Sequence, residues 1–209
     1  MLKFIFLNIS FLLTWNIYAS YIIIPMDKKQ KNHLKSYGIA YWTLEQDIDV
    51  SWLLNYRGGS FLIKYNNIIE KECLIRGVSY EIIADAQSNK ILIEISNLEK
   101  NQDVVKLEKA PKIAVYSPKS KQPWDDAVTL ALTYSEIPYD IIYDNEVINN
   151  ILPIYDWLHL HHEDFTGQYG KFYSVFRNTK WYKNQKIELE NLAKKLGYKK
   201  VSQLKLDVV

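Results

Sequence analysis

The sequence predicts an α/β fold built from two βαβ halves with mainly parallel sheets. Short β-branched or aromatic runs alternate along the chain with longer segments of helical periodicity, as in βαβ units. A polar and charged connection, residues 98–111, separates the first series from the second. Of the 209 residues, 48% are hydrophobic, which is enough to fill one large core or two small ones.

Residues 1–19 are predicted to be a secretory signal. Lys3 supplies a positive charge, residues 4–17 are uncharged and mainly apolar, and Ala19 is a small residue at which a signal peptidase would cut. The alternative is an uncleaved N-terminal anchor, which would be the chain's link to a membrane. We therefore expect an exported, periplasmic protein. Cys73 is the only cysteine, so no intramolecular disulfide is expected, and we interpret Cys73 as a packing residue.

The first half, residues 20–97, is expected to contain three strands and three helices. The predicted strands are apolar or β-branched, and Asp27 is a suitable N-cap for the first helix. Gly38 weakens the middle of that helix. In chain order we predict a strand at 21–25, a helix at 28–45, a strand at 50–55, a helix at 66–76, a strand at 78–83 and a helix at 86–96.

The second half, residues 112–209, repeats the alternation, so each half is expected to be flavodoxin-like or Rossmann-like. Pro138 ends one predicted helix, and Gly197 ends another in the manner of a C′ glycine. No such signal ends the last helix, which suggests that this half is incomplete at Val209. We predict strands at 112–116, 140–143 and 155–161, and helices at 125–136, 146–151, 168–177, 180–196 and 201–209.

Three of the four histidines lie where the predicted strand 155–161 runs into polar residues. His159 and His161 share one face of this strand, and His162, Glu163 and Asp164 follow at its carboxyl end, where open α/β sheets bind ligands. The cluster suits a divalent metal, a general base with its orienting acid, or a structural role at the strand end. We predict a catalytic role, with no bound metal and no cofactor.

Two further groups are candidate ligand-binding residues. Arg57 with Gly58 and Gly59 follows a strand, where backbone amides and a guanidinium can approach an anion; the alternative is a plain tight turn. Asp125 and Asp126 are candidate acids in a cleft; the alternative is that they stabilise a helix N-terminus through its dipole. The 26 basic and 24 acidic side chains are scattered, so we expect a small-molecule ligand and no nucleic-acid partner.

Six segments carry a resemblance to known proteins: YIIIPMD at 21–27, QKNHLK at 30–35, YGIAYW at 37–42, WLLNYRGGSF at 52–61, QPWDDA at 122–127 and HLHHEDF at 159–165. Together they resemble a family of exported bacterial proteins commonly labelled asparagine synthetase B. The resemblance spans essentially the whole chain after the signal. It implies long-range similarity of the second half to class I glutamine amidotransferase-like α/β proteins. It also implies that the family continues past Val209, to a glycine-rich strand that carries a cysteine.

Three functions follow as expectations. The first is an amidotransferase-like or hydrolase-like protein of unknown substrate, inactive as this portion of the family. The second is a non-catalytic binding module of the cell envelope for an anionic ligand. The third is the glutamine-hydrolysing asparagine synthetase of the family label. This activity needs an N-terminal cysteine and an ATP-binding loop. The sequence has Leu2 in place of the cysteine, and residues 57–60 do not form the complete loop motif, so this function is the least favoured alternative.

Overall fold

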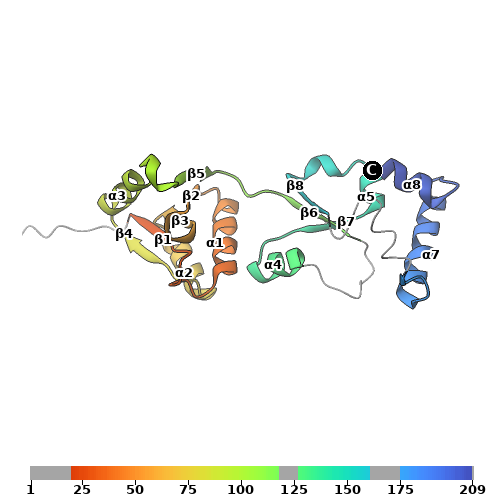
Figure 1. Cartoon of the computed structure of the whole chain (residues 1–209), viewed down its shortest axis with the longest axis horizontal. Helices are drawn as coiled ribbons and strands as arrows, with labels where there is room; N and C mark the ends of the chain where they lie inside the picture. Colours follow the sequence, from red (N-terminus) through yellow and green to blue (C-terminus); the bar gives the residue numbers. More distant parts are fainter. Residues whose placement is uncertain (1–19, 118–126, 161–174, 209) are drawn as a thin grey trace, which may run out of the picture.

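The computed structural model describes residues 20–117, 127–160 and 175–208, which form a mixed α/β fold with two sheets. The sheets follow one another along the longest axis of the molecule (Figure 1). Among the described residues, no helix combines the length and the apolar character needed to cross a bilayer. The predicted α/β character is confirmed.

The first sheet has five strands in the order β4-β1-β3-β2-β5, and every neighbouring pair is antiparallel. The expectation of a mainly parallel sheet in the first half is therefore wrong. Two of these strands were not predicted. Strand β3 directly follows the turn after β2, and β5 lies in the segment 98–111 that was predicted to be a connection. The strands are β1 (Tyr21–Ile24), β2 (Val50–Leu54), β3 (Ser60–Lys64), β4 (Glu81–Ile83) and β5 (Asp103–Leu107).

The turn between β2 and β3 explains the antiparallel arrangement. It covers residues 55–59, and Asn55, Arg57, Gly58 and Gly59 all have positive φ angles there. A turn this short joins only antiparallel neighbours, because parallel strands need a crossover of a dozen or more residues. The hairpin places β3 between β1 and β2, which produces the split βαβ motif with its βαββαβ order.

Helices cover both faces of this sheet. On one face, α1 (His33–Glu45) and α2 (Asn67–Ile75) pack on Ile22 and Ile24; on the other, α3 (Asp85–Ile95) packs on Ile23. The alternation of strand side chains therefore fills two core layers. Helix α1 begins later than expected, because the side chain of Asn32, rather than that of Asp27, caps it by accepting from the Lys35 N–H.

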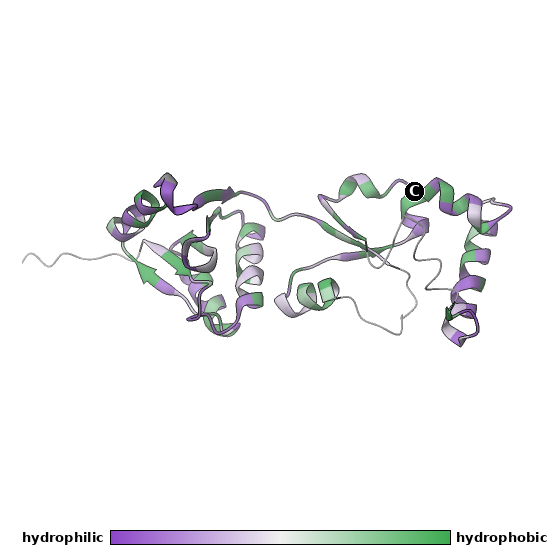
Figure 2. Cartoon of the chain, viewed as in Figure 1, coloured by the Kyte–Doolittle hydropathy of each residue, from purple (hydrophilic) through white to green (hydrophobic). Residues whose placement is uncertain are grey.

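The second sheet is parallel, with the order β7-β6-β8, as predicted for this half. Its strands are β6 (Ile113–Tyr116), β7 (Asp140–Ile142) and β8 (Trp157–Leu160). Helix α4 (Ala127–Ser135) covers one face, and α5 (Asp144–Ile148) and α8 (Val201–Val208) cover the other. Helix α7 (Lys180–Lys195) packs beside α8, and Figure 2 shows hydrophobic and hydrophilic residues interspersed along it.

The two sheets are joined through a contact between α1 and α4. A Cβ atom on Gly38 of α1 would lie 1.8 Å from the carbonyl oxygen of Ser135 of α4, so only glycine permits this approach. Glu136 forms ion pairs with Lys35 and, at 3.2 Å, with Arg76. The glycine that weakens α1 is therefore explained by a helix–helix contact.

Candidate functional site

The candidate site lies at the carboxyl edge of the parallel sheet β7-β6-β8. The central strand β6 is followed by α4 on one face, whereas β7 is followed by α5 on the other face (Figure 1). Open α/β sheets bind ligands outside the carboxyl ends of their strands, at the point where connections diverge to opposite faces. Residues at this edge are therefore the first to consider for function.

Four polar side chains form a cluster at this edge: Tyr116 at the end of β6, Tyr143 and Asp144 after β7, and Lys205 on α8. Tyr116 Oη donates to Asp144 Oδ1 at 2.5 Å, and Lys205 Nζ donates to the same oxygen at 2.9 Å. Lys205 Nζ also lies 3.2 Å from Tyr143 Oη and 4.5 Å from the centre of the Tyr143 ring. The ammonium group is held between a carboxylate and two phenols.

Asp144 is fully buried, with 0% of its surface exposed. A buried carboxylate is costly unless it is paired, and here Lys205, whose side chain is 33% exposed, supplies the opposite charge. Within the described part of the chain, Asp144 Oδ2 has no hydrogen-bond partner. The pair therefore lies at the border between the core and the surface, with one carboxylate oxygen left unbonded.

Local structure brings these groups together. The Glu146 carboxylate accepts from the Tyr143 N–H at 2.9 Å, which starts α5 and places Asp144 in its first turn, where the helix dipole favours a negative charge. On α8, Leu204 is fully buried and Val208 packs against the sheet core. These two contacts hold α8 so that Lys205 reaches Asp144.

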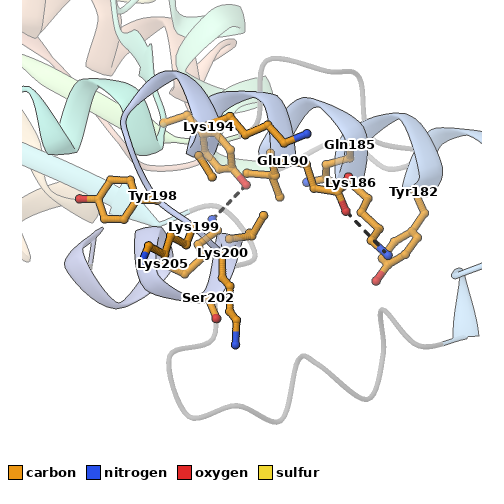
Figure 3. Close-up of a pocket in the computed structure, with 14 residues that line it drawn as sticks. Tyr182, Gln185, Lys186, Glu190, Lys194, Tyr198, Lys199, Lys200, Ser202 and Lys205 are labelled. Atoms are coloured by element: carbon orange, nitrogen blue, oxygen red, sulfur yellow. Dashed lines mark hydrogen bonds and ion pairs between the residues drawn. The ribbon is translucent and has the colours of Figure 1, made fainter.

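A groove lies beside this cluster, enclosed by α7, α8 and the turn between them (Figure 3). Its volume of about 670 Å³ lies within the range of small-molecule sites. Tyr143 and Lys205 belong both to the cluster and to the groove wall. The full lining is Tyr143, Tyr182, Gln185, Lys186, Leu189, Glu190, Ala193, Lys194, Tyr198, Lys199, Lys200, Val201, Ser202 and Lys205.

The groove has an excess of positive charge, with five lysines against one glutamate. Lys186 lies 4.0 Å from Glu190, and Lys205 is paired with Asp144. No ion pair to Lys194, Lys199 or Lys200 is present in the ranges that the structure describes. By contrast, a smaller hollow of about 270 Å³ between α5 and α7 is lined by two glutamates and one lysine. Positive charge is thus a property of this groove rather than of α7 as a whole.

The structure describes one residue of the predicted catalytic segment, His159, which is half-buried in β8. In register it lies opposite Val115, so it faces α4 rather than the side of the sheet where Tyr116 lies. Its ring centre is 6.5 Å from that of Trp157. The other predicted residues of the second half, His161, His162, Glu163, Asp164, Asp125 and Asp126, lie outside the described residues.

Arg57, by contrast, lies in the first sheet, in the turn between β2 and β3. Its Nε donates to Asp27 at 2.8 Å, and its two terminal nitrogens donate to Glu81 at 2.9 and 3.0 Å. An anion at Arg57 would therefore compete with two carboxylates that already occupy the guanidinium. Gly58 is required by the turn, because a Cβ there would lie 2.4 Å from the Met26 carbonyl oxygen, and Gly59 follows with φ of 94°.

Cys73 is buried in α2, and burial, with Glu70 and Glu72 nearby, raises the pKa of its thiol to about 12. Because the thiolate is the reactive form, this thiol is not a nucleophile at neutral pH, in agreement with a packing role. In the ranges 20–117, 127–160 and 175–208, no three histidine, cysteine or acidic side chains are grouped in a way that would hold a metal ion.

Sequence reasoning missed the cluster and the groove. One signal was present: Lys194-Lys195 and Lys199-Lys200 flank the helix-ending Gly197, so basic pairs lie on both sides of a turn. Nothing local marks Asp144, which is separated from Lys205 by 61 positions.

Comparison with known proteins found no matching family, no similar curated protein and no similar solved structure. The function of this chain is therefore inferred from the geometry of its own residues.

Proposed function

We propose that this chain is an exported binding module whose groove between α7 and α8 holds an anionic small molecule. The observation that carries the proposal is the lining of this groove, with five lysines and one glutamate around about 670 Å³. Three of the lysines have no carboxylate partner among the described residues, so a ligand that supplies negative charge would complement them. Binding of this kind requires no nucleophile.

The test is a calorimetric and thermal-shift titration with inorganic phosphate, acetate and succinate, and with choline as the cationic control. A ligand that binds the folded state raises the melting temperature as its concentration exceeds its Kd. We expect the anions, but not choline, to bind. We also expect their affinity to fall as salt is added, because exposed charges are screened over about 10 Å at 0.1 M ionic strength.

Two variants locate the site. The double substitution Lys199→Ala and Lys200→Ala removes two unpaired ammonium groups and is expected to weaken anion binding about fivefold, at roughly 0.5 kcal/mol for each exposed charge. Lys183→Ala is the matched control, because Lys183 is exposed on α7 but does not line the groove. Equal loss in both variants, or binding of choline as strong as that of the anions, would contradict the proposal.

A second candidate is the amidotransferase-like or hydrolase-like activity implied by the family resemblance. The parallel order β7-β6-β8, with a buried acid at its carboxyl edge, favours this candidate. Cys73, which is buried in the other half, would not supply its nucleophile. Hydrolysis of simple amides and esters, lost on Asp144→Asn but kept in Lys183→Ala, is the result that would favour this activity over binding alone.

A further inference from the structure

The groove between α7 and α8 differs along its length. Figure 3 shows Tyr198, Lys199, Lys200 and Lys205 at the end where α7 meets α8, and Tyr182 at the opposite end. The groove follows α7 from Tyr182 to Lys194, and these two positions are separated by about 18 Å along the helix axis. The groove is therefore long as well as positively charged.

Over the whole groove apolar surface exceeds polar surface, although Gln185, Lys186 and Glu190 also line the part away from the lysine end. Leu189 contributes apolar surface from the groove side of α7. The ring of Tyr182 adds aromatic surface, and the charge of Lys186 is offset by Glu190 at 4.0 Å. A small inorganic anion would meet the lysines but would leave this apolar surface exposed to water.

We infer that the ligand is an amphipathic organic acid, in which a carboxylate is carried on an extended hydrocarbon body. The carboxylate would lie near Lys199 and Lys200, and the hydrocarbon would lie along Leu189 toward Tyr182. This inference rests on the proposed function, since it assigns a chemical class to the ligand of the same groove. Apolar contact adds affinity because buried methylene groups leave water, whereas the lysines select the charged end.

The experiment compares acetate, butanoate, hexanoate, octanoate and octanol by calorimetry, all below the concentrations at which they aggregate. Octanoate is expected to bind best, and affinity along the series butanoate, hexanoate and octanoate is expected to rise about twofold to fourfold per methylene. Equal binding of acetate and octanoate would overturn the inference but leave the proposed function intact. Octanol binding as well as octanoate, or no binding by any acid, would overturn both.

Two variants separate the ends of the groove. Leu189→Ala is expected to reduce the chain-length dependence while acetate binding stays unchanged. The double substitution Lys199→Ala and Lys200→Ala is expected to weaken all acids by a similar factor. The melting temperature of each variant without ligand reports whether its fold is kept. If Leu189→Ala folds and keeps the full chain-length dependence, the hydrocarbon does not lie along α7 and the inference is wrong.

Discussion

The contact between Gly38 and Ser135 provides a sharp test of how the two sheets are joined. Replacing Gly38 by alanine in an ordinary exposed helix would stabilise the protein by about 1 kcal/mol, because alanine is the better helix former. Here the added Cβ would lie 1.8 Å from the Ser135 carbonyl oxygen. The structure therefore predicts the opposite sign for Gly38→Ala.

The magnitude follows from the displacement that the new methyl group requires. Ordinary van der Waals contact starts at about 3.4 Å, so α1 and α4 must separate by about 1.6 Å. Such a shift strains the ion pairs of Glu136 with Lys35 and Arg76. Overpacking of this kind costs about 1 to 3 kcal/mol, and an obstacle made of backbone places the cost at the upper end. After the gain in helix propensity, the net loss is about 2 kcal/mol.

Urea unfolding followed by circular dichroism measures this loss. Asn191→Ala, at an exposed position of α7, is the control and is expected to be neutral or to stabilise by a few tenths of a kcal/mol. Because Gly38 lies in the contact between the sheets, we also expect the variant to unfold less cooperatively, with separate transitions for the two halves. A Gly38→Ala variant that is about 1 kcal/mol more stable than the parent would refute this account of the contact.

Three further predictions concern buried or paired groups. Lys205→Met leaves the fully buried Asp144 without its cation and is expected to destabilise the fold by about 2 kcal/mol in urea unfolding. This loss is smaller than for a fully buried pair, because Lys205 is partly exposed. Adding Asp144→Asn should recover part of the lost stability, and no recovery would count against the pairing of Lys205 with Asp144. Hydrogen bonds from Arg57 and from a backbone N–H hold the pKa of Asp27 below its ordinary value, so Asp27 stabilises the fold above its unfolded-state pKa, and this contribution disappears as the pH falls through the folded-state pKa. The free energy of unfolding of Arg57→Leu and of the parent is measured in urea at about pH 7 and about pH 3. At about pH 7 we expect Arg57→Leu to be less stable than the parent, and on acidification we expect it to lose less stability than the parent loses. Identical losses would show that the hydrogen bond does not perturb Asp27. A thiol reagent should label Cys73 only at the rate of unfolding, because burial raises its pKa to about 12; fast labelling of the native protein would contradict that burial.

Local patterns predicted most of the individual elements but only one of the two sheet topologies. In the second half, helical segments separate the strands, and crossovers of this length join parallel strands. In the first half, the run at 60–64 follows a turn in which Asn55 and Arg57 adopt positive φ, a conformation that composition does not reveal for these residues. Strand β5 was hidden because the charged residues Asp103 and Lys106 interrupt its apolar residues, as is common in an edge strand.

The sequence and the structure both point to the carboxyl edge of the parallel sheet, but through different residues. The prediction relied on a histidine cluster, of which the structure describes His159 facing α4. The groove instead collects lysines from α7, α8 and the turn between them. Apart from the lysine pairs on both sides of Gly197, these lysines form no pattern in the sequence, and their excess over acidic groups becomes visible only when the two helices are packed together.

By itself the sequence determined the α/β class, the parallel second sheet and the positions of most helices, because these depend on the periodicity of nearby residues. Only the tertiary structure decided that β3 lies between β1 and β2, that Asp144 is neutralised by Lys205, and that Gly38 faces Ser135. These features depend on contacts between residues that are far apart in the chain. Their free energy comes from packing and from charge pairing, neither of which leaves a local pattern in the sequence.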